Sequence, residues 1–193
     1  MSPHPAIDIA QARTFWKVYA QGLFGTPRAW AHKGERLIHA FEAVAAASDS
    51  KSMHLNMDDQ AFMLAGMSIE VQLKAILVSD QRARAFVIGS RPKKGSPDAD
   101  LWSRFFSHNL LELAQAADVT LTDSETRTAI ALTQYIYWRG RYVVPKERGL
   151  DEFIPVQLAN GLAGQAHRTS VIDARVLIDR VSLEVKARLY AHA

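Results

Sequence analysis

Several polar residues of this chain are spaced so that a helix would place them side by side. Glu70 and Lys74 lie one helical turn apart, and so do Arg104 and His108. A histidine can serve as a general acid or base because its ordinary pKa is close to neutral pH. These residues are therefore candidates for a polar binding or catalytic site. Under the structural alternative, His108 is a hydrogen-bonding group between apolar neighbours, and Glu70 and Lys74 form an ion pair at the rim of a core.

A second group of candidates lies in the segment YIYWRGRYVVP, residues 135–145. Arg139 and Arg141 stand near the predicted end of a helix, where cationic side chains interact favourably with the helix dipole. Aromatic rings beside them could stack on nucleic-acid bases, although such rings more often pack in a core. The aromatic residues in question are Tyr135, Tyr137, Trp138 and Tyr142.

Composition excludes some kinds of site. The chain has no cysteine, so a disulfide, a thiolate zinc site and a cysteine nucleophile are ruled out. His54 and Asp58 have the spacing of metal ligands, but no further ligands cluster around them, and we expect no metal and no other cofactor. The net charge of +3 does not by itself indicate a nucleic-acid partner. The most basic loop, residues 91–94, could attract phosphates or be simply solvated.

The candidate residues depend on helices for their positions, and helix starts recur along the chain. A short polar residue that accepts from the first amides, or a proline at the first helical position, marks such a start. These signals occur at Thr26-Pro27, at Asn56 before two aspartates, at Ser96-Pro97, and at Thr122 with Glu125 in capping-box spacing.

Apolar residues repeat with helical period between these starts. The stretch 62–78 is apolar on nearly every side, which predicts the most buried helix. Two flanking helices are expected to be amphipathic, with the apolar stripes Trp30, Leu37, Phe41 and Val44 (with Gly34 on the same line) and Ala174, Ile178, Val181, Val185 and Leu189. Gly34 would let another helix approach closely. In the second helix, i,i+4 pairing distances join Arg175 to Asp179 and Glu184 to Arg188.

The fold class predicted from these patterns is all-α, a single-domain helical bundle over residues 1–193. No strand alternation of convincing length occurs, and only residues 142–144 form a short β-prone run. The first residues lack the basic and apolar regions of a signal peptide, and no long window of apolar residues is free of charge. We therefore expect a cytoplasmic protein that does not cross a membrane.

Three segments, taken in order, resemble the HEPN family of helical domains. In such domains a core helix carries a Glu and a Lys in an apolar run, a His-Asp/Asn-Leu element opens the next helix, and an Arg-Tyr-Pro-like element closes a later one. The matching residues are Glu70 and Lys74, His108-Asn109-Leu110, and Arg141-Tyr142 with Pro145 displaced by two valines. The resemblance covers about residues 57–146. It leaves N-terminal helices within 8–48 and a C-terminal helix over 170–191 as additions.

This resemblance implies a bundle that binds RNA or nucleotides, often as a homodimer, in a stress, toxin-antitoxin or phage-defence setting. Many members are metal-independent ribonucleases in which an arginine binds the scissile phosphate and a following histidine assists proton transfer. Here Arg104 and His108 are closer in sequence than in that class, and no histidine follows Arg141 within reach. By resemblance the catalytic candidates are Arg141, His108 and Arg104. The expected ligand-binding residues are Glu70, Lys74, His108, Asn109, Arg139, Arg141 and Tyr142.

The sequence leaves three functions open and does not decide whether the protein is an enzyme. The favoured function is RNA or nucleotide binding. One alternative is an inactive helical module that associates with a protein partner as a regulator. The other is a ribonuclease that uses Arg104 with His108, or Arg141 with a histidine brought near by the fold.

Overall fold

The computed structural model is an all-α single-domain bundle, to which one short two-stranded hairpin is added. It describes residues 14, 18–19, 22–48, 58–88, 92–139, 154–157, 163–166 and 169–190. The elements are α2 (Pro27–Ser48), α3 (Asp58–Ser79), α4 (Gln81–Ile88), α5 (Pro97–Phe105), α6 (Leu110–Ala116), α7 (Asp123–Gln134), the π-helical turn η1 (Tyr135–Arg139), β1 (Ile154–Gln157), β2 (Ala163–Ala166) and α8 (Val171–Tyr190).

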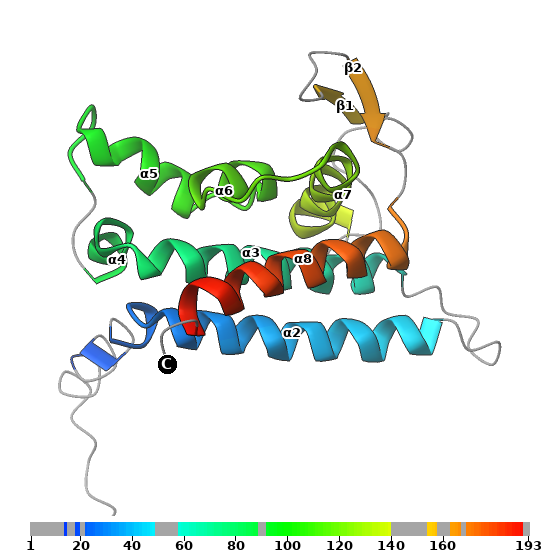
Figure 1. The fold of residues 1–193 in the computed structure, drawn as a ribbon, viewed down its shortest axis with the longest axis horizontal. Coiled ribbons are helices and arrows are strands. Elements are labelled where there is room, and N and C mark those ends of the chain that lie inside the picture. Colours follow the sequence, from blue (N-terminus) through cyan, green and yellow to red (C-terminus); the bar gives the residue numbers. More distant parts are fainter. Residues whose placement is uncertain are drawn as a thin grey trace, which may run out of the picture.

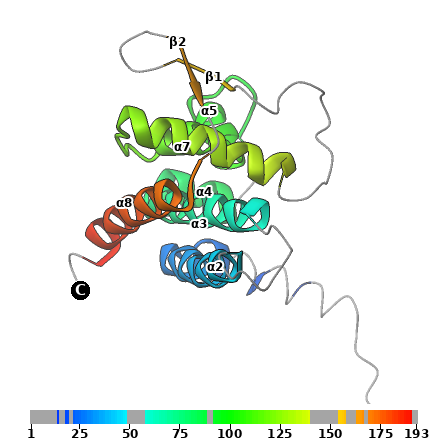
Figure 2. The same ribbon diagram turned by 90° about the vertical axis from the view of Figure 1, so that its right-hand side faces the viewer.

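The helices stack in layers. In Figure 1, α2 forms the lowest layer, α3 and α8 lie side by side above it, and α5, α6 and α7 lie above these. Figure 2 shows the same order from the side, with the hairpin beyond α7. Helix α3 contacts α2, α4, α6, α7, α8 and η1, so the core is built around it.

Most of the side chains of α3 are buried, as the apolar stretch 62–78 predicts. Among the described residues, α3 is also the helix whose length and apolar character would suffice to cross a membrane, but 83% of that stretch is buried inside the protein. Its composition is therefore explained by its place in the core. The expected cytoplasmic location stays a prediction.

The predicted helix starts agree with the structure. Helices α2 and α5 begin at Pro27 and Pro97, and α3 begins shortly after Asn56, which itself lies outside the described residues. At the start of α7, Thr122 Oγ1 accepts from the amide of Glu125 at 3.3 Å, and the carboxylate of Glu125 accepts from the amide of Thr122 at 2.7 Å. This is the reciprocal capping box that the spacing predicts.

Helix α2 packs against α3 at Gly34. A Cβ atom at this position would lie 2.5 Å from Cγ of Gln72 in α3, so the missing side chain lets the two helices approach closely, as predicted. Trp30 and Leu37 were expected on the buried stripe, but they are half-buried and border a groove. The side chains of α2 that are fully buried belong to Ala31, Phe41 and Ala45.

Helix α8 covers α3 with the apolar stripe that the sequence predicts. The buried members of this stripe are Ala174, Ile178, Val181 and Val185, and Leu189 packs beside them. Arg188 pairs with Glu184 at 3.3 Å, as expected from their spacing. Arg175, by contrast, binds Glu42 of α2, and this hydrogen bond from the guanidinium lowers the pKa of the Glu42 carboxyl.

The hairpin was not predicted. Strands β1 and β2 pair antiparallel, with Ile154 opposite Ala166 and Gln157 opposite Ala163. The β-prone run at 142–144 lies outside the described residues. Four-residue strands are too short for a clear alternation of apolar and polar side chains, which explains why the pattern failed to indicate them.

We expect Gly34→Ala to lower the free energy of unfolding by about 1 to 2 kcal/mol, measured by urea denaturation. The new methyl group collides with Gln72, and this penalty exceeds the roughly 1 kcal/mol that alanine gains over glycine in a helix. Gly22→Ala is the matched control, because no atom lies within 4 Å of a Cβ built there. Equal stabilities of the two variants would contradict the close approach of α2 and α3.

Candidate functional site

Glu70, Lys74 and His108 meet at one carboxylate. Lys74 Nζ donates to Glu70 Oε1 at 2.6 Å, and His108 Nδ1 lies 3.0 Å from Glu70 Oε2. The first two residues are on α3, and His108 is in the connection between α5 and α6. The structure thus brings together expected ligand-binding residues from two of the three segments that resemble HEPN domains. A role of these residues in ligand binding stays a prediction.

The ion pair is buried, whereas the histidine reaches the surface. The side chains of Lys74 and Glu70 are 8% and 10% exposed, and that of His108 is 46% exposed. Because an ionised carboxylate only accepts hydrogen bonds, we assign the shared hydrogen to Nδ1 of His108. In the neutral ring, Nε2 is then an acceptor, and it makes no hydrogen bond with any described residue. Glu70 therefore orients an imidazole at the surface.

Tyr137 packs edge-on against His108. The ring centroids are 5.6 Å apart and the ring planes are nearly perpendicular, at 89°. Tyr137 belongs to η1, the π-helical turn that continues α7, and such turns occur often at functional sites. Its side chain is 38% exposed, so part of the ring is open to solvent. His108 and Tyr137 together form an exposed pair of rings next to the buried ion pair, and we call this pair the His108 site.

Capping interactions fix the backbone around His108. The side-chain oxygen of Asn109 accepts from two amides in the first turn of α6, at 3.1 and 3.4 Å. Ser107 Oγ accepts from the amide of Asn109 at 3.0 Å, and Thr133 Oγ1 of α7 accepts from the first amide of α6 at 3.1 Å. Asn109 was expected to bind a ligand, but its side-chain oxygen is used in capping the helix.

The expected pairing of Arg104 with His108 on one helix face is wrong. Helix α5 ends at Phe105, so the two residues do not belong to the same helix. The guanidinium of Arg104 donates to Asp100 at 2.9 Å, one turn earlier in α5. Arg139 is the last residue of η1. Arg141 and Tyr142 lie outside the described residues.

Phe105 is a neighbour of the site that no pattern in the sequence indicated. It is almost fully buried, and Lys74 Nζ lies over its ring at 5.7 Å from the centroid. A cation above an aromatic face is attracted by the ring quadrupole, so Phe105 helps to hold the buried ammonium group. Phe105 also contacts Trp30 of α2, whose ring packs edge-on against it with the ring centroids 5.9 Å apart.

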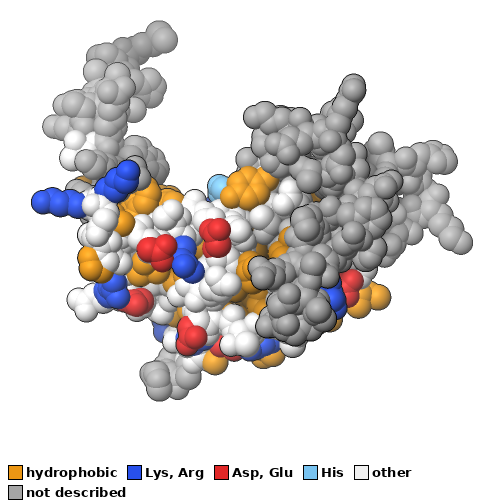
Figure 3. All heavy atoms as spheres, turned by 90° about the horizontal axis from the view of Figure 1, so that it is seen from above, with side chains coloured by type: hydrophobic (Ala, Val, Ile, Leu, Met, Phe, Trp, Pro, Cys, Tyr) orange, Lys and Arg blue, Asp and Glu red, His pale blue; other side chains and the backbone are white. Residues whose placement is uncertain are grey.

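The face around α5, α6 and α7 carries a mixture of charges. Figure 3 looks onto it from above and shows a histidine next to a hydrophobic side chain, with acidic and basic side chains interspersed. Lys93 and Lys94 of the basic loop are exposed. Within the described ranges, no group of three or more His, Asp or Glu side chains is placed to hold a metal ion. His54 lies outside those ranges.

Comparisons with protein-family models, with curated proteins and with solved structures found no match to this chain. The class of protein is therefore defined by the fold and the site alone. It is a helical bundle with a histidine that a buried, charge-paired carboxylate orients at its surface.

We expect Glu70→Gln and Lys74→Met each to lower the free energy of unfolding by about 3 kcal/mol or more, because each leaves one buried charge without its partner. The double variant removes both charges and should recover to within about 1 kcal/mol of the wild type in urea denaturation. Additive losses in the double variant would show that the two side chains do not form a coupled buried pair.

Proposed function

We propose that this protein binds nucleotides or single-stranded RNA at the His108 site. The proposal depends most on the contact of His108 with Glu70, which holds the imidazole in one orientation at the surface beside Tyr137. The resemblance of the segments around Glu70 and His108 to HEPN domains supports the same class of ligand. A stress, toxin-antitoxin or phage-defence setting is part of this proposal.

The chemistry of the site suits a base and its sugar. An exposed tyrosine ring can stack on any base, and an imidazole nitrogen without a partner among the described residues can accept from a ribose hydroxyl. Acidic and basic side chains are mixed over this face, so few phosphates would be neutralised. Binding should therefore depend more on stacking than on salt concentration.

The same contact favours a second function, metal-independent cleavage of RNA. A histidine oriented by a carboxylate can take the proton of a ribose 2′-hydroxyl while that oxygen attacks the adjacent phosphorus. The bond from phosphorus to the 5′-oxygen then breaks, the 5′-oxygen takes a proton from water, and a 2′,3′-cyclic phosphate is left. Arg104 is paired with Asp100. Of the two arginines that the sequence analysis names as catalytic candidates, Arg141 therefore remains for binding the phosphate. Under this function the protein is an enzyme.

We expect Tyr137→Leu and His108→Ala each to weaken binding of a fluorescently labelled single-stranded RNA, measured by fluorescence anisotropy. Loss of one stacking contact corresponds to about 1 to 3 kcal/mol, or roughly a fivefold to 150-fold rise in Kd. His39→Ala is the matched control, because His39 is an exposed histidine on α2. Unlabelled AMP should compete if a single nucleotide suffices.

The same samples distinguish the candidate functions. Cleavage of the RNA in the presence of a metal chelator, lost in His108→Ala and kept in His39→Ala, would support the enzyme. Binding without cleavage would support the binding protein. If neither His108→Ala nor Tyr137→Leu changes the affinity, or if the wild type binds no RNA and no AMP, the proposal is wrong.

Association with a second copy of the chain is favoured by a separate observation on α8. Its outer face carries large hydrophobic side chains at helical spacing, and all of them are exposed: Ile172, Val176, Leu183 and Tyr190. Val176 and Tyr190 are equally far from Leu183 along the helix. Two α8 helices packed antiparallel about Leu183 would therefore bury this stripe against itself and bring Asp179 close to Lys186 of the second copy.

We expect Leu183→Glu to convert a dimer into a monomer in size-exclusion chromatography with light scattering, because it places a charge at the centre of the paired stripe. Ala43→Glu, on an exposed position of α2, is the control and should leave the dimer intact. A wild-type protein that is monomeric at high micromolar concentration would contradict association through α8.

A further inference from the structure

A groove of about 580 Å³ lies along the first half of α2 and involves neither residue of the His108 site. This volume falls within the range of small-molecule sites in proteins. The apolar walls are formed by Trp30 and Leu37 of α2 and by Leu23 and Phe24, which precede the helix. Leu23 and Phe24 are 45% and 46% exposed, so the groove leaves large apolar surfaces in contact with water.

The aromatic wall of the groove is fixed before any ligand arrives. Trp30 Nε1 donates to the backbone carbonyl of Phe24 at 2.6 Å, and the two rings lie 5.8 Å apart. The contact of Trp30 with the buried ring of Phe105 holds the indole from another side. A wall that is already ordered lowers the entropic cost of binding.

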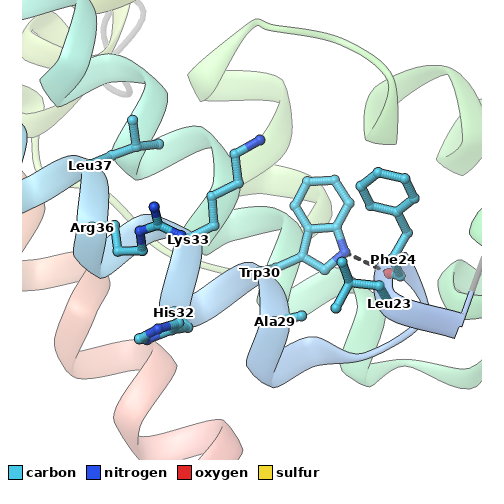
Figure 4. A pocket seen from close by; sticks show the side chains of 8 residues that line it. All are labelled: Leu23, Phe24, Ala29, Trp30, His32, Lys33, Arg36 and Leu37. Atoms are coloured by element: carbon cyan, nitrogen blue, oxygen red, sulfur yellow. Dashed lines mark hydrogen bonds between the residues drawn. The ribbon is translucent and has the colours of Figure 1, made fainter. Parts of the chain in front are cut away.

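Two cations stand beside this wall. Figure 4 shows Lys33 rising from the same side of α2 as Trp30 and Leu37, with Arg36 on the adjacent turn. Neither Lys33 nor Arg36 forms an ion pair with a described residue, and the described residues that line the groove include no acidic side chain; the nearby Glu35 is paired with His32. The groove therefore combines an apolar body with a positive edge whose two cations have no ion-pair partner among the described residues.

The lining argues against a nucleotide as the occupant. Among the described residues that line the groove there is no carboxylate, amide or hydroxyl side chain. The indole N–H of Trp30 is already bonded to Phe24, and the imidazole of His32 is already paired with Glu35 at 3.2 Å. The hydroxyl and amino groups of a nucleoside would lose their water without gaining partners, which costs affinity. A hydrocarbon body with one anionic group meets the apolar wall and the cations without such a loss.

We infer that this groove binds an apolar carboxylate of the fatty-acid type, with its hydrocarbon chain along Trp30, Phe24 and Leu37 and its carboxylate at Lys33 and Arg36. The inference is independent of the proposed function, because it uses no residue of the His108 site. Lys33 and Arg36 of α2 thus bind the anionic group of the ligand.

Isothermal titration calorimetry with dodecanoate, below the concentration at which it forms micelles, tests this inference on the full chain. We expect saturable binding, weakened by about tenfold or more in the double variant Lys33→Glu and Arg36→Glu, because reversing both charges repels the carboxylate. Arg127→Glu, an exposed charge reversal on α7, should bind as the wild type does. Circular dichroism of each variant verifies that the helices are retained.

A neutral analogue completes the experiment. Dodecanol should bind about tenfold or more weakly than dodecanoate, because it lacks the group that Lys33 and Arg36 attract. The inference is overturned if dodecanoate does not bind saturably, if dodecanol binds equally well, or if the double charge reversal leaves the affinity unchanged. Equal weakening by Arg127→Glu would also overturn it, since the effect would then come from net charge.

Discussion

The structure depends on one constraint, the burial of a lysine and a glutamate in the helix that forms its core. Charges this far from water are tolerated only when they are paired and their remaining hydrogen-bonding capacity is used. Lys74 donates to one oxygen of Glu70 and lies over the ring of Phe105, and His108 donates to the other oxygen of Glu70. The connection between α5 and α6 must therefore pass over α3 at this point.

A buried ion pair adds little to stability compared with apolar side chains of similar volume, so stability alone does not explain this one. Its clearest effect is geometric. Glu70 is held by Lys74 and in turn orients the ring of His108, while caps from Ser107, Asn109 and Thr133 fix the backbone on either side. The arrangement gives a surface imidazole the precision that binding or proton transfer requires.

Local features of the sequence predicted most of the helices, but they did not predict the contacts between segments that are far apart in the chain. Capping residues and the apolar run of α3 act over one or a few turns, so they indicated the helices correctly. The Arg104 and His108 spacing misled because α5 ends at Phe105, and the contact of His108 with Glu70 joins residues far apart in the chain. The groove was missed because Trp30 and Leu37 have core-like spacing. The dipeptide Asn160-Gly161 between the strands was the available hairpin signal.

Whether Glu70 orients the imidazole of His108 for a nucleotide is tested most directly by long-range proton–nitrogen NMR of the isotopically labelled protein, which reads the position of the ring hydrogen. In the free protein the neutral ring should carry its hydrogen on Nδ1, bonded to Glu70, and adding AMP should shift the Nε2 signal of His108 while the signals of His39 stay in place. A hydrogen on Nε2 in the free protein, or an AMP effect on His39 equal to that on His108, would show that Glu70 does not have this role.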